Sequence, residues 1–207
     1  MLSQPTLEKL KTMKLSGMAK GLEDQFRFGN ASDLSFEERL GMLVDREYEE
    51  RSMRSLQRRL QVARLRYQAS LEDLDVSATR GLDQSLILSL ASCTWIRERN
   101  NVLITGATGV GKSYLACALG HRACLEGYRV AYLRTPRLFR ELAEAKGDGQ
   151  FGKLLEKWKK ADLLIFDDWG IAPLSGEHCR DLLEILEDCY HKGSTVVTSQ
   201  DPFDHWH

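Results

Sequence analysis

The segment Asn101-Val-Leu-Ile-Thr-Gly-Ala-Thr-Gly-Val-Gly-Lys-Ser113 joins a β-branched run to a glycine-rich turn and then to a helical pattern. The turn, Gly106 to Ser113, fits the pattern GxxxxGK[ST] in full. Its glycines allow the backbone to point several N–H groups into one concavity, and the start of the following helix adds partial positive charge. The sequence therefore predicts a phosphate-binding loop, or P-loop, between a strand and a helix.

The residues expected to contact a nucleotide are those of this loop and the first helical turn. They are Gly106, Ala107, Thr108, Gly109, Val110, Gly111, Lys112, Ser113 and Tyr114. Lys112 is expected to reach the β- and γ-phosphates and to act in catalysis, and Ser113 is expected to bind Mg²⁺. A chance glycine-rich turn is the alternative, but the flanking strand and helix favour a nucleotide site.

A second apolar run, Leu163-Leu-Ile-Phe, ends in the adjacent acids Asp167 and Asp168. This is the Walker B pattern of a P-loop protein. Asp167, at the strand end, is expected to hold the Mg²⁺ shell, and Asp168 is expected to act as a base or to orient water toward the γ-phosphate. The alternative is that the two acids only cap a turn at Trp169-Gly170.

Short β-branched runs alternate with longer helical stretches in the second half of the chain. We expect strands at 101–105, 128–133, 162–166 and 194–198, and helices at 112–126, 136–146, 151–160 and 176–191. This alternation predicts an α/β fold with a parallel sheet between two layers of helices. Thr198 or Ser199 is expected to sense the γ-phosphate if the fourth strand lies between the P-loop and Walker B strands, although a polar strand end is an equal alternative.

The first half of the chain is helical in pattern. We expect residues 1–75 to form a helical module that binds DNA or a partner and residues 76–207 to form the α/β core, with the boundary within 71–83. Ser35 and Glu38 are expected to form a capping box at a helix start. On a helix predicted at 45–67, a basic stripe lies opposite the apolar residues and consists of Arg51, Arg54, Arg58, Arg59 and Arg66.

This basic stripe has no acid between its first and last members, so it is a candidate contact for the phosphates of double-stranded DNA. A solvated helix face is the alternative interpretation. The formal net charge of −1 argues against a protein that coats nucleic acid uniformly. The stripe therefore predicts a local contact with DNA.

The five cysteines show no CxxC spacing, which is typical of reduced thiols in a cytoplasmic protein. No apolar run approaches the roughly 20 residues that span a bilayer. His205 and His207 have no accompanying cysteine or acid cluster, so we interpret them as a feature of the chain end and not as metal ligands.

Beyond these motifs the chain resembles the IstB-like ATP-binding proteins, AAA+ helpers of insertion-sequence transposases that are related to the DnaC helicase loaders. The resemblance covers essentially the whole chain and is most specific at Ser16-Gly-Met-Ala and at Asp167-Asp-Trp-Gly. It implies an AAA+ core that binds and hydrolyses ATP with Mg²⁺, assembly into a homo-oligomer on double-stranded DNA, and a transposase partner in target selection.

The chain also departs from that family pattern. Cys189 stands where the family usually has arginine, Asp201 stands where it usually has leucine, and the chain stops at His207 before the strand and helices that carry an arginine finger. We therefore expect a shortened core with impaired hydrolysis, since a missing arginine finger costs on the order of 10³ to 10⁵ in rate. A helicase loader and a non-hydrolysing scaffold are the competing functions.

Overall fold

The computed structural model describes residues 3–28, 34–75, 81–171, 174–189 and 192–202. The chain divides into two compact units, Met1–Arg58 and Arg59–His207. Residues 59–75, which we expected in the helical module, thus group with the α/β unit. The physical reason is apolar packing, because Leu65, Ala69 and Leu71 lie against the helix that follows the P-loop.

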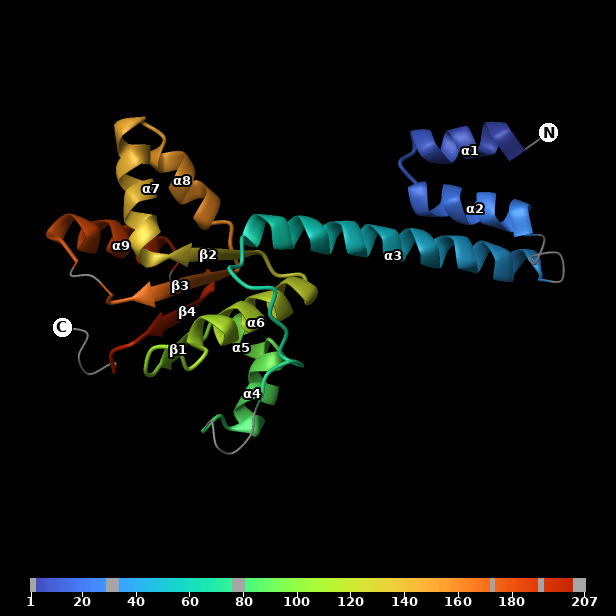
Figure 1. Ribbon diagram of the computed structural model, residues 1–207. Coiled ribbons are helices and arrows are strands. Elements are labelled where there is room, and N and C mark those ends of the chain that lie inside the picture. Colours follow the sequence, from blue (N-terminus) through green and yellow to red (C-terminus); the bar gives the residue numbers. More distant parts are fainter. Residues whose placement is uncertain (1–2, 29–33, 76–80, 172–173, 190–191, 203–207) are drawn as a thin grey trace. The chain divides into compact units, whose positions relative to one another are not determined.

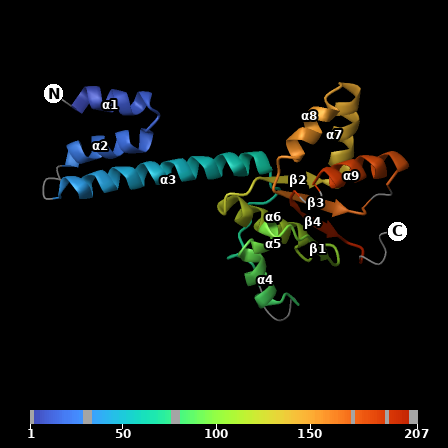
Figure 2. The same cartoon turned by 180° about the vertical axis from the view of Figure 1, so that it is seen from behind.

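The helical unit contains α1 (Ser3–Thr12), α2 (Ser16–Phe28) and most of α3 (Phe36–Ala63), which lie side by side in both ribbon views (Figure 1, Figure 2). The predicted capping box starts α3: the Ser35 amide donates to the Glu38 carboxylate at 2.8 Å, and the Glu38 amide donates to the Ser35 hydroxyl at 3.3 Å. Two orphan backbone donors are satisfied in this way.

Glycine at position 17 explains part of the Ser-Gly-Met-Ala motif. A Cβ atom at Gly17 would lie 2.7 Å from the Glu47 Cα and 2.8 Å from the Arg46 carbonyl oxygen, so only glycine lets α2 approach α3 this closely. The buried Glu47 carboxylate accepts hydrogen bonds from the amides of Gly17 at 2.7 Å and Met18 at 3.1 Å. An acid of α3 therefore caps the positive end of α2.

The predicted helix at 45–67 is part of one 28-residue helix that begins at Phe36 and ends four residues earlier than expected, at Ala63. Arg64 adopts a left-handed backbone with φ of 53°, which is a common way to end a helix. Arg66 and Tyr67 therefore lie beyond the helix, and Arg66 is not part of a stripe on its surface. The prediction of a continuous helix to Tyr67 was wrong.

The α/β unit confirms the predicted alternation of strands and helices. Its elements after Arg99 are β1 (Val102–Thr105), α6 (Lys112–Leu125), β2 (Val130–Arg134), α7 (Thr135–Gly147), α8 (Phe151–Trp158), β3 (Leu163–Trp169), α9 (Gly176–Cys189) and β4 (Ser194–Ser199). All strand pairs are parallel, in the order β1-β4-β3-β2. Two short helices, α4 (Gln84–Ala91) and α5 (Thr94–Arg97), were not predicted.

Helices cover both faces of this sheet (Figure 1, Figure 2). On one face, Leu164 and Phe166 of β3 pack with buried residues of α7, α8 and α9. On the other face lies α6, where a Cβ at Gly120 would meet the Ile165 side chain at 2.7 Å. Burial of β3 on both faces accounts for its unbroken apolar run. Within the described ranges, no helix combines the length and apolar character needed to cross a membrane.

Glu47 is expected to make the helical unit sensitive to acid. Burial acts to raise the pKa of Glu47, but hydrogen bonds from Arg51 and from the Met18 and Gly17 amides outweigh it, so the pKa lies below its ordinary value of 4.5. The stabilisation that the ionised Glu47 gives to the folded helical unit is therefore fully present above the ordinary pKa of 4.5. It is lost as the pH falls through the lower pKa of Glu47 in the folded state.

Glu47→Gln should destabilise α2 by about 1–3 kcal/mol at neutral pH, because a charged acceptor for buried amides is lost. Hydrogen exchange of the α2 amides measures this change. Glu49→Gln, an exposed neighbour on the same helix, is the control. Equal α2 protection in both variants would contradict the capping role.

Candidate functional site

The loop from Gly106 to Ser113 connects the end of β1 to the start of α6, as the sequence predicted. Gly109 and Gly111 have φ angles of 84° and 99°, a region that favours glycine. The Lys112 Nζ donates to the carbonyl oxygens of Gly106 at 2.7 Å and Ala107 at 2.8 Å. The lysine therefore folds back over its own loop, at the point where a phosphate chain would lie.

The Asp167 carboxylate lies at the carboxyl end of the sheet and is fully buried. Its Oδ1 atom accepts hydrogen bonds from the Ser113 hydroxyl at 2.8 Å and the Thr198 hydroxyl at 2.5 Å. Its Oδ2 atom accepts a hydrogen bond from the Tyr132 hydroxyl. The P-loop helix and strands β2 and β4 are thus joined to β3 at one carboxylate.

Asp168 lies in an irregular part of β3, where the register with β4 shifts between Phe166 and Trp169. Its φ of 62° is left-handed, which is unusual for a residue other than glycine. The Asp168 amide donates to the Thr198 hydroxyl at 3.1 Å, which helps to hold this conformation. Bulges and strained residues of this kind are frequent beside functional sites, where they direct a side chain.

The structure separates the two sensor candidates that the sequence left open. β4 lies between β1 and β3, as expected, and Thr198 contacts both acids of the Walker B pair. Ser199 instead donates to the Trp169 carbonyl oxygen at 3.1 Å. The next residue, Gln200, accepts a hydrogen bond from Thr108 of the P-loop at 2.8 Å. Thr198 and Gln200 are therefore the residues that connect the end of β4 to the site.

Two residues near the acids were not predicted. Arg134, the last residue of β2, donates to the Asp168 carboxylate at 2.6 Å. Tyr132 lies two residues earlier on the same strand, and burial, followed by its hydrogen bond to Asp167, raises the pKa of its hydroxyl. The signal available in the sequence was that β2, if paired with β3, would bring its polar carboxyl end beside the Walker B acids.

The structure does not bring the five arginines of the predicted stripe together as one unpaired face. Arg51 and Arg54 form ion pairs with Glu47 and Glu50, which lie one helical turn earlier, at 2.6 and 2.9 Å. Both acids precede the segment 51–66, which itself contains no acid. Arg58 is exposed on α3.

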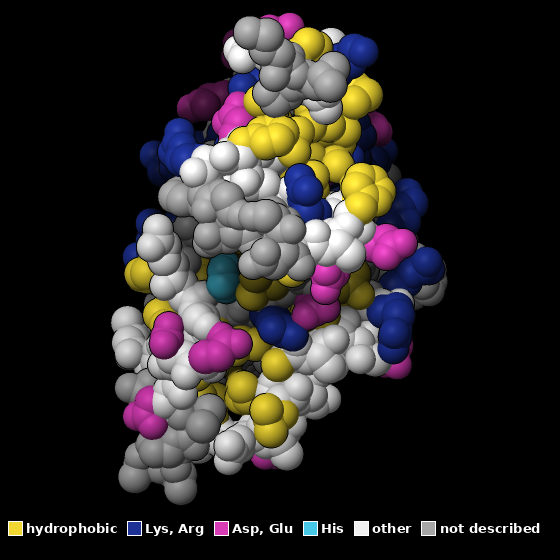
Figure 3. All heavy atoms as spheres, turned by 90° about the vertical axis from the view of Figure 1, so that its right-hand side faces the viewer, with side chains coloured by type: hydrophobic (Ala, Val, Ile, Leu, Met, Phe, Trp, Pro, Cys, Tyr) yellow, Lys and Arg dark blue, Asp and Glu magenta, His cyan; other side chains and the backbone are white. Residues whose placement is uncertain are grey.

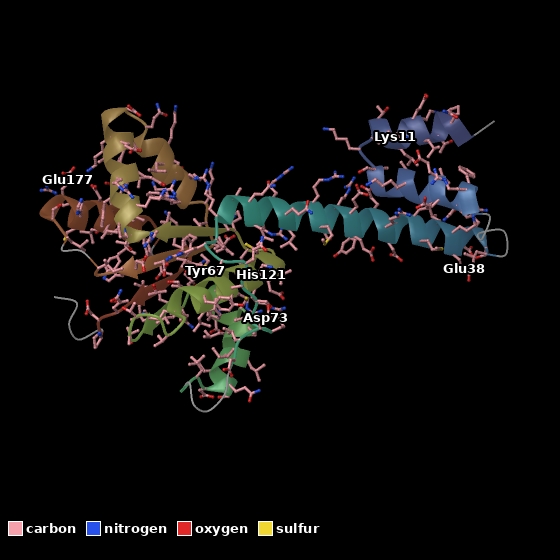
Figure 4. The ribbon with its side chains drawn as sticks, viewed as in Figure 1. Lys11, Glu38, Tyr67, Asp73, His121 and Glu177 are labelled. Atoms are coloured by element: carbon pink, nitrogen blue, oxygen red, sulfur yellow. The ribbon has the colours of Figure 1, made fainter. Side chains whose placement is uncertain are left out.

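The last two arginines lie in the α/β unit. The Arg59 side chain donates to the Cys124 carbonyl oxygen at 2.9 Å. Arg66 reaches the Walker B acids, at 3.8 Å from Asp167 and 3.7 Å from Asp168. It therefore lies beside the Walker B acids and not on a helix surface. Figure 4 labels Tyr67, the residue after Arg66, beside the sheet and α6.

A cavity of about 340 Å³ borders Asp168. Its walls include the stacked rings of Phe139 and His178, whose centroids are 4.0 Å apart. The Asp168 side chain is 17% exposed, in contrast to the fully buried Asp167. Solvent can therefore reach the second acid of the pair and not the first.

The hydroxyl of Ser113 and the carboxylate of Asp167 are hard oxygen donors that suit Mg²⁺, which takes few protein ligands and completes its shell with water and phosphate oxygens. Among the described residues, no group of three or more His, Cys, Asp or Glu side chains could hold a metal ion. His205 and His207 lie outside the described residues.

Several solved structures share the fold of the α/β unit. The AMPPCP-bound DnaA from Aquifex aeolicus aligns with a TM-score of 0.60 at 20% identity, over 70% of this chain and 45% of that one. A crystal structure of the DnaC helicase loader aligns with a TM-score of 0.55 at 21% identity, over 66% of this chain and 79% of that one. At these identities the likeness concerns the fold alone.

Similarity in sequence is more specific. The family described as IstB-like ATP binding protein matches residues 8–207. An ATP-binding protein of the insertion sequence IS1162 from Pseudomonas fluorescens is 50% identical over 98% of this chain and 88% of its own length. The corresponding protein of IS21 from Pseudomonas aeruginosa is 30% identical over 95% of this chain and 74% of its own length. The resemblance seen in the motifs is thereby confirmed, and the chain belongs to the IstB-like ATP-binding protein family.

Proposed function

We propose that this chain binds ATP with Mg²⁺ at the P-loop and hydrolyses it in the service of insertion-sequence transposition. The observation that carries the proposal is the 2.8 Å contact between the Ser113 hydroxyl and the Asp167 carboxylate. It joins the first turn of α6 to the end of β3, so the two expected Mg²⁺ ligands meet although they are far apart in the sequence. Bound Mg²⁺ supplies positive charge that stabilises the phosphate oxygens.

Lys112 has contacts that a nucleotide would replace. Its ammonium group is held by two neutral carbonyl oxygens, which are weaker partners than phosphate oxygens. Exchange of these bonds for bonds to β- and γ-phosphates would give the ammonium group charged partners in place of the Gly106 and Ala107 carbonyl oxygens. The nine residues Gly106 to Tyr114 remain the proposed nucleotide contacts.

Asp168 is the proposed base, or the residue that orients water for attack on the γ-phosphate. Its carboxylate borders a cavity, and Arg134 and Arg66 both contact it at one oxygen, Oδ2. Thr198 connects this acid to Asp167 through two hydrogen bonds, which makes it the preferred sensor of the γ-phosphate. Ser199, the other candidate, faces the Trp169 carbonyl and is the weaker proposal.

Transposition is favoured over helicase loading by the relatives. Proteins that are 30–50% identical to this chain are described as ATP-binding proteins of insertion sequences, whereas the DnaC structure shares 21% identity. A transposase is accordingly the proposed protein partner, and a homo-oligomer the proposed working form. The helical unit offers apolar surface for such contacts: Figure 3 shows hydrophobic side chains gathered on the face turned to the viewer. Phe26 of α2 and Phe36, Met42 and Val44 of α3 are exposed.

Double-stranded DNA is the proposed nucleic-acid partner of the helical unit. Arg51 and Arg54 remain 58% and 52% exposed although they are paired. The Arg54–Glu50 pair is partly exposed and contributes little to stability, so Arg54 can turn to phosphates at small cost, whereas Arg51 would leave the buried Glu47 carboxylate. With Arg58 they form the reduced basic face on α3 that supports this proposal.

Lys112→Ala should weaken the affinity for Mg·ATP by about ten- to a hundredfold, because a charged hydrogen bond to phosphate is lost. Isothermal titration calorimetry measures this affinity. The melting temperature should hardly change, since the hydrogen bonds of Lys112 to described residues go to its own loop. Lys153→Ala, an exposed change on α8, is the control. An unaltered affinity of Lys112→Ala for Mg·ATP would contradict the assignment of this loop as the nucleotide site.

Asp168→Asn should reduce ATP turnover by about a hundredfold or more while it preserves nucleotide binding, because the amide cannot accept a proton from water. Phosphate release gives the turnover and calorimetry gives the binding. Asp148→Asn, at the opposite end of α7 from the site, should behave as wild type. If Asp168→Asn turns over ATP at the wild-type rate, Asp168 is neither the base nor the water-positioning residue.

Replacing Arg54 and Arg58 together by Gln should weaken duplex DNA binding and reduce the slope of log affinity against log salt by about two. Fluorescence anisotropy over a salt series measures both. The control replaces Arg137, which is ion-paired with Glu141 at the same i,i+4 spacing, together with exposed Lys153. An identical slope in both double variants would exclude α3 as the DNA contact.

A further inference from the structure

Arg66 reaches the acidic pair from a segment outside the P-loop and the Walker B strand. It follows Ala63, the last residue of α3, by three positions, and the left-handed backbone at Arg64 turns the chain away from the helix axis. The Arg66 Nη1 atom lies 3.8 Å from the Asp167 Oδ2 and 3.7 Å from the Asp168 Oδ2. One guanidinium group therefore faces both carboxylates.

The segment around Arg66 is anchored on α6. Leu65 lies over Gly120, where an added Cβ would be 2.9 Å from the leucine side chain. Ala69 is 3% exposed and packs with Cys117 and Ala118. The Arg66 guanidinium carbon lies 5.1 Å from the centroid of the Tyr67 ring, within range of a cation–π interaction. These contacts restrict the guanidinium to the vicinity of the acids.

The charges explain why a cation lies there. Asp167 is fully buried, and a buried carboxylate without a nearby positive charge is costly even when it is hydrogen-bonded. Arg134 pairs with Asp168 at 2.6 Å. In the part of the chain that the structure describes, Arg66 is the cation found within 4 Å of Asp167. Arg66 and Arg134 together balance the two acids when no metal is bound.

The two oxygens of Asp167 have different partners. Ser113 and Thr198 donate to Oδ1, which is the proposed metal side, whereas Arg66 and Tyr132 face Oδ2. A metal at Ser113 and the Arg66 guanidinium would thus lie on opposite sides of a single carboxylate. Two positive charges that share one carboxylate repel each other and compete for its charge.

We propose that Arg66 is a positioning residue that stands in for the metal charge at Asp167 and Asp168 and thereby limits how strongly the site holds Mg²⁺. This inference rests on the proposed nucleotide function. Because coupling free energies are reciprocal, Mg²⁺ binding weakens the hold of the acids on Arg66. The occupancy of the metal site is thereby transmitted to residues 64–71 and to the end of α3.

The test measures the affinity for AMPPCP by calorimetry, once with saturating Mg²⁺ and once in EDTA. The ratio of the two affinities isolates the contribution of the metal, because any direct effect of Arg66 on the nucleotide enters both measurements. Arg66→Gln should raise this ratio by about threefold to thirtyfold, the range expected when one like charge near a partly exposed ion is removed. A folding defect would lower nucleotide and metal binding and so would not produce this gain.

Two variants complete the design. Arg64→Gln removes the same charge from an exposed position two residues earlier and should leave the ratio within twofold of wild type because solvent screens it. Arg66→Lys keeps the charge and should return the ratio toward wild type. A ratio in Arg66→Gln that equals or falls below the wild-type ratio overturns the inference, and so does an equal rise in Arg64→Gln.

A second readout follows the segment itself. With AMPPCP bound, addition of Mg²⁺ should speed hydrogen exchange within residues 64–71 of the wild type and should have no effect there in Arg66→Gln. If the hydrogen-exchange rates of residues 64–71 in the wild type do not change when Mg²⁺ is added, the inferred effect of metal binding on this segment and on the end of α3 is wrong. If the wild type binds no AMPPCP under any condition, the proposed function fails, whereas AMPPCP binding with an unaltered ratio overturns the role of Arg66 alone.

Discussion

A carboxylate can be buried at the end of a parallel sheet only if every side of it meets a hydrogen-bond donor or a cation, and Asp167 meets this condition through four different segments. Ser113 comes from the P-loop helix, Thr198 from β4, Tyr132 from β2 and Arg66 from the chain after α3. Removal of any one of these partners would leave a buried charge partly unsatisfied. Asp167 therefore adds a polar tie between the first turn of α6 and the end of the sheet to the apolar packing of α6 on that sheet.

The neighbouring acid shows the opposite environment. Asp168 has a left-handed backbone at a register shift and a partly exposed carboxylate beside a cavity. A strained residue persists only where surrounding contacts hold it. Here the Thr198 hydroxyl accepts a hydrogen bond from the Asp168 amide. Two consecutive residues of one strand thus acquire different chemistry: one is enclosed and suited to binding, and the other is reachable by water.

Local patterns were sufficient for most of the α/β unit. The P-loop and the Walker B strand follow from short motifs, and the alternation of strands and helices follows from the residue pattern, so the parallel sheet could be predicted; the place of β4 between β1 and β3 was only a condition for the sensor candidates. Arg134 and Tyr132 could not, because their place beside the acids depends on the pairing of β2 with β3, in which Arg134 aligns with Asp167. Sequence periodicity does not specify which strand pairs with which.

The basic stripe failed as a pattern for a related reason. Its spacing assumed a helix that continues to Tyr67, whereas the helix ends at Ala63 and the last arginine turns toward the acids. The ion-pair partners of Arg51 and Arg54 are Glu47 and Glu50, which precede the stripe in the sequence. Helix ends and long-range charge partners are set by packing, and they are the least predictable features of a single sequence.

The close approach at Gly17 has a practical consequence for dissection of the molecule. Because the first turn of α2 is capped by Glu47 of α3 and not by a residue of its own, a peptide that stops before Glu47 lacks the acceptor for two backbone amides. Such a peptide would fray from its amino end, since short helices in water depend on their caps. Any fragment meant to present α2 to a binding partner must therefore include α3 through at least Glu50. The Glu50 carboxylate also accepts hydrogen bonds from the Ser16 hydroxyl and the Lys20 ammonium group.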